Sequence, residues 1–436
     1  MQQAHNIYNP SMKNRLLISL LALMLSAGFS LSCSGEKSEG KVIEFWTLQL
    51  SPYFDEYFRD LITRYESEHP GVTIRHIDIP YDAAIQKLMA AASAGTPPDI
   101  INLSSDFLAK FEKFGLFADL RNHDSEDSIR SRYLENALAE CVYDNKIIAL
   151  PWYLNTYAMI YNKDLLRKAG FDSSDVPKTF DEFTAFIREY KNRAGKYATF
   201  WNIGRDSYLP MMLGSEDIPM TDSQMTKALF NKPESSEKIA EWVDLVKGKY
   251  LSRDCVIRPG SAIIEPYQSG QVAMVFTGPV FLRQVKENAP GIYAETGIAP
   301  PVTGRTGKHE LAAMALSVLS SSAHKQESYE FVRYILNAEN QLRFAKMAPV
   351  FPSHNDALKD RYFTETDGSL ETTARVMGAE YLPSATRLRS YLRHPRFDQL
   401  RNFFDEAIQN AVLTRISTQD ALDKAAKSWN AVLDEN

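Results

Sequence analysis

The segment KVIEFWTLQLSPYFDEYFRDLITRYESEHPGVTIRHIDIP, residues 41–80, contains two different hydrophobic periods. Its first six residues are β-branched or aromatic at most positions, whereas the apolar side chains of 54–65 recur at helical spacing. The helical pattern stops at His69-Pro70-Gly71, and 72–80 then alternates apolar and polar side chains as a strand does. This order predicts a β-α-β unit and therefore an α/β sheet.

The next segment extends the same pattern. Residues 83–94 are rich in alanine and predict a second helix, and the apolar stretch 99–103 predicts a third strand. Strands that alternate with helices indicate a doubly wound sheet, in which ligands bind outside the carboxyl ends of the strands. Trp46 lies at the predicted end of the first strand and Asp106 follows the third, so we expect both at a ligand site.

A second α/β region begins near Pro151. Residues 157–161 predict a strand, and Thr179 with Glu182 three positions later forms a capping-box pattern that predicts the start of a helix. Helical segments then predominate, 273–276 and 312–319 are expected as returning strands, and amphipathic helices complete the chain. The sequence therefore predicts two α/β units.

The amino-terminal segment has the features of a targeting signal. Lys13 and Arg15 precede LLISLLALMLSAGF, the 14 residues from 16 to 29. A helix of this length spans about 21 Å, which is too short for a hydrocarbon core of about 30 Å. A basic segment, a short apolar segment and small residues are typical of a secretory signal peptide, which we place at 1–32.

Small residues followed by Cys33 resemble a bacterial lipobox, so we expect lipid attachment at Cys33 and a polar tether over 33–40. Ser30 stands where that motif usually has leucine, which leaves ordinary secretion with an unmodified cysteine as the alternative. Met12 is a second possible start. Either way, we expect a cell-envelope protein that faces the periplasm or the exterior, anchored to the membrane if Cys33 is acylated.

Composition excludes several classes of function. The 436 residues carry a formal charge of −6, which argues against a nucleic-acid partner, and three cysteines are too few for a disulfide scaffold. The eight histidines form no metal-binding motif, no GxSxG nucleophile elbow occurs, and GRTGK at 304–308 lacks the flanking residues of a phosphate-binding loop. We therefore expect no enzyme activity, no metal and no cofactor.

Four ordered segments carry a family resemblance. They are GTPPDIINLSSDFLAKFEKFGLFADL (95–120), ALPWYLNTYAMIYNKDLLRKAGFDSSDVPKTFDEF (149–183), QSGQVAMVFTGPVFLR (268–283) and the late strand and helix of 312–347. Together they resemble the extracellular solute-binding proteins, family 1 or maltose-binding-like, of bacterial ABC importers.

This resemblance implies a two-lobed periplasmic-binding-protein-like fold of type II, in which each lobe is a doubly wound sheet flanked by helices and a cleft lies between the lobes. The first lobe would comprise 41–148 plus 315–350 and the second 153–311 plus 354–436. The hinges would lie near 149–152, 312–314 and 350–352. Cys141 and Cys255 would then occupy different lobes, so we expect no disulfide between them.

The resemblance also suggests which residues bind the solute. Aromatic rings stack on the apolar face of a sugar, while amides and carboxylates bond its hydroxyls. Packing within a lobe is the alternative for Trp46, a helix cap for Asp106, and hinge packing for 152–155. The candidate ligand-binding residues are Trp46, Asp106, Trp152, Tyr153, Asn155, Trp201, Gly278 and Phe281.

These features predict a lipid-anchored, monomeric binding component of an ABC transporter. It would capture a sugar or oligosaccharide between the lobes and deliver it to the transmembrane permease subunits. One alternative is the same fold with a non-sugar solute, either a glycerophosphate, for which Arg205 is a possible partner, or a polyamine. A surface-anchored glycoside hydrolase is a further alternative, because a fold can bring two distant carboxylates together.

Overall fold

The computed structural model describes residues 40–435. The predicted signal peptide (1–32), Cys33 and the tether as far as residue 39 lie outside the described residues, so their predicted roles stay predictions. Across 40–435, each helix is too short or too polar to cross a bilayer.

The first sheet is mixed. Three parallel strands at one edge are built by the β-α-β-α-β segment that opens the fold, and antiparallel strands from later in the chain complete the sheet. The order is β2 (Val72–Ile79), β1 (Lys41–Leu48), β3 (Ile100–Ser104), β11 (His309–Val318), β6 (Leu150–Thr156) and β12 (Phe351–Pro352), with β13 (Ala385–Thr386) also paired to β11.

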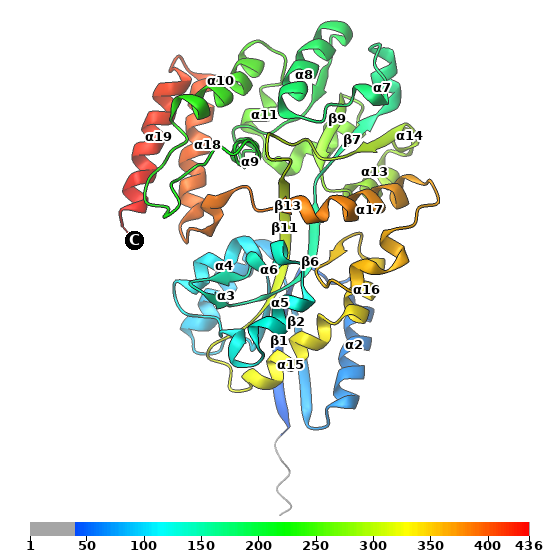
Figure 1. Ribbon diagram of the computed structural model, residues 1–436, viewed down its shortest axis with the longest axis vertical. Helices are drawn as coiled ribbons and strands as arrows, with labels where there is room; N and C mark the ends of the chain where they lie inside the picture. The colour runs from blue at the N-terminus through cyan, green and yellow to red at the C-terminus, as the bar shows by residue number, and fades with distance from the viewer. Residues whose placement is uncertain (1–39, 436) are drawn as a thin grey trace, which may run out of the picture.

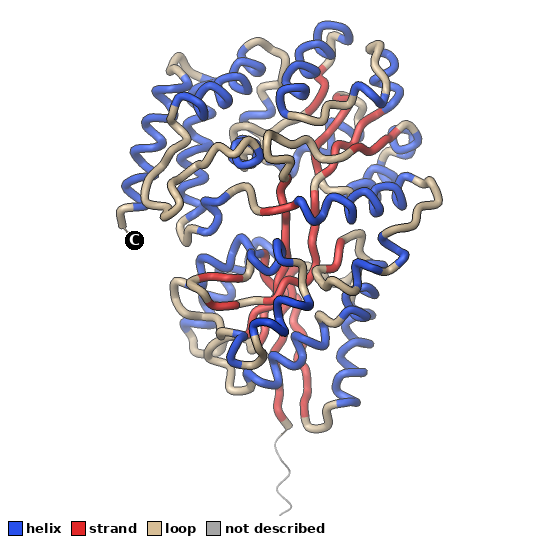
Figure 2. The backbone as a smooth tube through the Cα atoms, in the orientation of Figure 1, coloured by secondary structure: helices blue, strands red, loops and turns tan. Residues whose placement is uncertain are grey.

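Helices cover this sheet, as Figures 1 and 2 show. Their apolar faces pack on strands such as β3, which is buried on both sides and therefore reads as a continuous apolar run. The helices are α2 (Asp55–Glu68), α3 (Ala84–Ser93), α4 (Ser105–Glu112), α5 (Glu126–Arg132), α6 (Glu135–Ala139), α15 (Lys325–Ile335) and α16 (Ala338–Met347), with a small ribbon of β4 (Val142–Tyr143) and β5 (Lys146–Ile147).

The second sheet has the order β10 (Thr296–Ala299), β7 (Ala158–Asn162), β9 (Val272–Thr277) and β8 (Tyr197–Thr199). Both halves of the predicted capping box are present at the start of α8 (Phe180–Ala194), where Thr179 and Glu182 bond each other's backbone. The other helices of this region are α7 (Lys163–Lys168), α8 (Phe180–Ala194), α9 (Leu209–Ser215), α10 (Pro233–Lys247), α11 (Asp254–Ile257), α12 (Ile264–Gln268), α13 (Phe281–Asn288), α14 (Pro290–Ala294), α17 (Leu370–Tyr381), α18 (Phe397–Leu413) and α19 (Thr418–Leu433).

Each sheet has its own hydrophobic core, and the two cores define two lobes (Figure 1). Cys141 is buried in the first core and Cys255 in the second, and neither is bonded to another cysteine. Burial raises the pKa of both thiols, which keeps them protonated at neutral pH.

The cores correct two of the predicted boundaries. Residues 149–152 were expected at a hinge, but Trp152 and Leu154 belong to the first core, so the chain leaves that lobe only after residue 154. The segment 354–436 was expected wholly in the second lobe. Its residues Phe363 and Ala385 instead pack in the first core, because this part of the chain crosses back before α18.

Strands β6 and β11 lie between the lobes and pair antiparallel with each other (Figures 1 and 2). A β-bulge interrupts their register between Met314 and Ala315, close to the predicted hinge at 312–314. The extra residue at this bulge is Trp152 of β6. A bulge bends the strand that carries it and increases its twist, so β6 changes direction near the boundary between the lobes.

Candidate functional site

A cavity of about 300 Å³ lies beside β6 and β11, at the boundary of the two lobes. Its walls come from the strands β6, β9 and β11 and from the loops and helix starts of the second lobe. The described residues that line it are all uncharged: Asn155, Thr156, Tyr157, Tyr208, Gly260, Ile263, Thr277, Gly278, Val280, Phe281 and Ala312.

The alternation of strand side chains produces the floor of this site. Tyr153 and Asn155 are two residues apart on β6 and are partly exposed, while their neighbours are buried in the first core. On β11 they pair with Met314 and Ala312. The side chain of Ala312 is short, so the space above this pair stays open as part of the cavity.

Two tyrosines form the aromatic wall. The ring of Tyr157 lies parallel to that of Phe276, with centroids 5.1 Å apart and planes 8° apart, and Tyr208 meets Tyr157 edge to face at 6.2 Å. Because Phe276 covers one face of Tyr157, the ring can offer its other face to a ligand. Burial raises the pKa of both phenols, so both remain neutral hydrogen-bonding groups at physiological pH.

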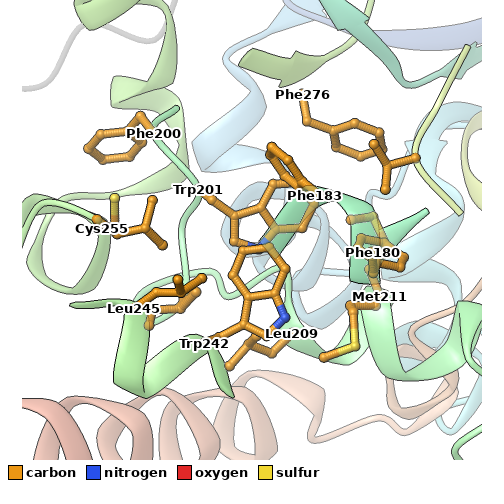
Figure 3. Close-up of a cluster of buried hydrophobic side chains, with 14 of the residues drawn as sticks. Phe180, Phe183, Phe200, Trp201, Leu209, Met211, Trp242, Leu245, Cys255 and Phe276 are labelled. Carbon is orange, nitrogen blue, oxygen red and sulfur yellow. The ribbon is translucent and has the colours of Figure 1, made fainter. Parts of the chain in front are cut away.

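The structure corrects the prediction for Trp201. Its side chain is fully buried and packs against Phe183 and Trp242 in the second core (Figure 3). It offers no surface to a ligand, but it touches Tyr208 edge to face at 5.1 Å. Trp201 therefore supports the aromatic wall from behind.

The prediction for Trp152 is corrected for the same reason. This ring is fully buried among the aromatic side chains of the first core, including Phe344. It meets Tyr153, the next residue along β6, edge to face at 5.1 Å. In each lobe, then, a buried tryptophan supports a tyrosine near the boundary.

The position of Trp46 in its strand is a correction, while its role as a ligand-binding residue stays a prediction. Strand β1 continues to Leu48, so Trp46 lies within the strand and not at its end. Its side chain packs against the first core and donates from Nε1 to Oε1 of Glu44 at 2.7 Å. It is partly exposed and is not among the residues that line the cavity.

Asp106 lies in the first turn of α4, and the residue that caps the helix is Ser104. The carboxylate of Asp106 is therefore free for another role. It lies 3.4 Å from the guanidinium of Arg387, which also donates to Ser105 at 2.8 Å and is paired with Glu140. Arg387 directly follows β13, at the point where the chain leaves the first core. Because Asp106 is paired with Arg387, Asp106 also faces the boundary between the lobes.

Three of the predicted residues come together at the cavity. Asn155, Gly278 and Phe281 all line it, while Tyr153 lies further along the same face of β6. Sequence reasoning missed Tyr157 and Tyr208. Tyr157 could have been found, because 153, 155 and 157 are alternate positions of one strand, but nothing local in the sequence marks Tyr208.

A family model described as bacterial extracellular solute-binding protein matches residues 60–369. This chain belongs to that family. The predicted resemblance is thereby confirmed at the level of the family. Residues 40–435 hold no cluster of three metal-ligating side chains.

Individual solute-binding relatives agree with this membership. A candidate oligosaccharide periplasmic-binding protein from Synechococcus sp. MITs9220 is 32% identical, covers 90% of this chain and 99% of its own, and superposes with a TM-score of 0.82. This likeness confirms the predicted two-lobed α/β fold, and both sheets are mixed.

Two curated relatives have different solutes. The galactooligosaccharide-binding protein of Bacillus subtilis is 20% identical over 96% of this chain and 97% of its own length. The sn-glycerol-3-phosphate-binding periplasmic protein of Pectobacterium atrosepticum is 24% identical over 66% of each chain. All three relatives are described as binding proteins, in agreement with the expectation of a binding role.

Proposed function

We propose that this protein is the lipid-anchored substrate-binding component of an ABC importer, that it captures a sugar or oligosaccharide between its lobes, and that it delivers the solute to the permease. The observation that carries the proposal is the cavity at the lobe boundary, where an aromatic wall meets uncharged hydrogen-bonding groups. Its volume lies at the small end of the range of about 300–1,000 Å³ for ligand sites.

The side chains of the cavity match the two surfaces of a sugar ring. Tyr157 and Phe281 supply flat apolar area for the C–H face, and Asn155 with Thr277 supplies polar atoms for the hydroxyl rim. A polyamine would need several carboxylates, and none lines this cavity among the described residues. Because no carboxylate lines the cavity among the described residues, the cavity wall also lacks the pair of carboxylates that glycoside hydrolysis uses.

The proposed mechanism is a movement between two states. The solute would bind one lobe, and rotation about β6, β11 and the β12 segment would enclose it between both lobes. The enclosed form would then be the one that the permease receives. The relatives that bind oligosaccharides support this proposal by analogy, as does the shared fold.

Glycerophosphate is the second candidate, because a relative with that solute covers two thirds of this chain. The uncharged cavity wall favours the sugar. A phosphate dianion would need a cationic partner, and Arg205 lies in a different depression, which it shares with Asp405 and Glu406.

A thermal-shift panel tests the proposal. At about 100 times the dissociation constant, a solute that binds only the folded protein should raise the melting temperature by about 3–8 °C. We expect maltotriose, galactotriose or arabinotriose to do so, and sn-glycerol 3-phosphate and spermidine to have no effect. Phe281→Ala should weaken the response, whereas Phe403→Ala, a partly buried phenylalanine of α18, should not. A shift with spermidine or the phosphate alone would contradict the sugar assignment.

A further inference from the structure

A second cavity at the lobe boundary, of about 420 Å³, is lined by α13 and α17 of the second lobe and by the end of α16 and β12 of the first. In Figure 1, α13, α16 and α17 lie on one side of β6 and β11, and α4 and α18 lie on the other. We call this cavity the rear groove; its lining residues fall within 279–287, 345–351 and 371–375, together with Tyr362. Among the described residues, Val280 alone lines both this groove and the proposed sugar cavity.

The apolar part of the rear groove is incompletely covered. Leu282 and Ala374 belong to the second core, and Val350 and Phe351 belong to the first. Met347, at the end of α16, lines the same groove and is 44% exposed. Exposed apolar surface in a concave site indicates a missing apolar partner, and methionine adapts readily to partners of different shape.

The rim of the rear groove is cationic. Its charged side chains are Arg283, Lys286, Lys346 and Arg375, with Glu287 and Glu371 as the two carboxylates. The carboxylates are already engaged, because Glu287 pairs with Arg283 at 3.0 Å and Glu371 pairs with Lys286 at 2.6 Å. Lys346 is paired with Asp360 outside the groove at 3.4 Å. The remaining cation of the rim is Arg375.

Neutral groups hold Arg375 in place. Its Nε donates to the carbonyl oxygen of Tyr362, and Nη2 donates to the carbonyl oxygen of Glu365 at 3.2 Å. The guanidinium also lies over the ring of Tyr362, 3.8 Å from its centroid. Across 40–435, Arg375 is in no ion pair with a carboxylate, so these contacts orient the guanidinium and leave its charge without a counter-charge at the groove.

We propose that the rear groove binds an amphiphilic carboxylate, with Arg375 as the partner of the carboxylate group and the surface around Met347 as the partner of the hydrocarbon body. Arginine forms strong, charge-assisted hydrogen bonds with carboxylates. A cationic amphiphile would be repelled by the same rim. This inference goes beyond the proposed function and does not require that a sugar binds.

The position of the rear groove couples its ligand to the arrangement of the lobes. On the other side of β6 and β11, Lys110 of α4 pairs with Asp398 of α18 and so holds the lobes together. A rotation about β6 and β11 that separated α4 from α18 would bring the end of α16 toward α13 and narrow the groove. A ligand that fills the groove therefore favours the arrangement in which α4 and α18 are in contact.

Calorimetric titration with octanoate tests the inference. We expect one site per chain, and at least about tenfold weaker binding of 1-octanol, which lacks the charge, and of octylamine, which reverses it. Arg375→Gln should weaken octanoate about tenfold and leave 1-octanol unchanged, which also shows that the groove is intact. Met347→Ser should weaken both probes several-fold, because it removes apolar surface from the groove.

Variants outside the groove complete the design. Arg167→Gln and Leu413→Ser are the matched controls, since Arg167 is 64% exposed and pairs with Asp164 on α7, and Leu413 is 38% exposed at the end of α18. Both should bind octanoate as the natural chain does. Lys110→Met should weaken octanoate several-fold from a distance, because loss of the pair with Asp398 favours the arrangement in which the groove is narrow.

The outcomes separate this inference from the proposed function. The site is wrong if octanoate does not bind, if 1-octanol or octylamine binds as tightly, or if Arg375→Gln and the natural chain bind octanoate equally. Equal affinity of Lys110→Met and the natural chain for octanoate would overturn the coupling to the lobes. If octanoate binds as expected and no saccharide binds, the proposed function fails and this inference stands.

Discussion

Buried aromatic residues in this protein act on the site through the residues that they support. Trp201 packs in the second core and meets Tyr208 edge to face. Trp201→Ala should lower the free energy of unfolding by about 3–5 kcal/mol, because it leaves a large cavity in a closely packed core. Denaturant unfolding measures this change.

A ligand titration of the folded variant completes that test. Tyr208→Ala, which removes part of the cavity wall, should weaken sugar binding more than Trp201→Phe, which keeps an aromatic support. The opposite order would show that Trp201 contacts the solute directly.

Asp405 gives the fold a pH dependence. The carboxylate accepts from the backbone N–H groups of Asp206 and Ser207. Burial nevertheless raises its pKa from 3.8 to about 6, with Asp206 raising it further and Arg401 opposing the rise. A raised carboxylate pKa means that the folded state binds the proton more tightly than the unfolded state, so stability falls as pH rises from about 4 to 6.

Replacement of the Asp405 carboxyl group should remove this dependence of stability on pH. Relative to the natural chain, Asp405→Asn should gain up to about 3 kcal/mol of unfolding free energy between pH 4 and pH 7, at about 1.36 kcal/mol for each unit of pKa shift. Urea unfolding at several pH values checks this. If the unfolding free energies of Asp405→Asn and the natural chain differed by the same amount at every pH, the prediction would be contradicted.

At the scale of elements, α17 (Leu370–Tyr381) joins the two lobes, since Ala374 packs in the second core and Ala379 packs against the first. A Cβ atom added at Gly378 would overlap with the ring of Phe351 in β12. Alanine normally favours a helix by up to about 1 kcal/mol over glycine, but overpacking costs about 1–3 kcal/mol. Gly378→Ala should therefore destabilise the protein by about 1–2 kcal/mol in urea unfolding, and a gain in stability would show that α17 does not pack this closely.

Elements with local signals were predictable from sequence. The strand at 72–79, the helix that follows Phe54 and the capping box at Thr179 all lie where their patterns placed them. The end of β1 was misjudged, because the polar Thr47 inside it is buried by the neighbouring strand. That contact is long-range and leaves no mark in the local pattern.

The site residues also divide into those that the sequence predicted and those that only the fold reveals. Asn155, Gly278 and Phe281 were found because their segments resemble the family, and all three line the cavity. Trp201 was predicted from the resemblance of its segment to the family, and such a resemblance does not show whether an aromatic ring lines a cavity or packs beneath it.

At the scale of the whole molecule, α4 of the first lobe contacts the second lobe at the start of α18. Lys110 pairs with Asp398 and lies over the ring of Phe397, 4.4 Å from its centroid. These contacts stabilise the arrangement in which the lobes are close. Lys110→Met should shift the population toward an open form and weaken solute binding several-fold. Small-angle scattering should show a larger radius of gyration without solute, and unchanged values would contradict this.

Saccharide binding against the aromatic wall between the lobes should depend on the ring of Tyr157. Isothermal titration of the saccharide selected by thermal shift tests it most directly, with Tyr157→Ala as the variant and Tyr197→Ala, a partly buried tyrosine away from the cavity, as the control. Loss of a stacking ring and its hydroxyl should weaken binding by about 2–3 kcal/mol, or roughly 30- to 150-fold. We expect one site per chain, with binding weakened in Tyr157→Ala and unchanged in Tyr197→Ala. Equal affinity of both variants would contradict it.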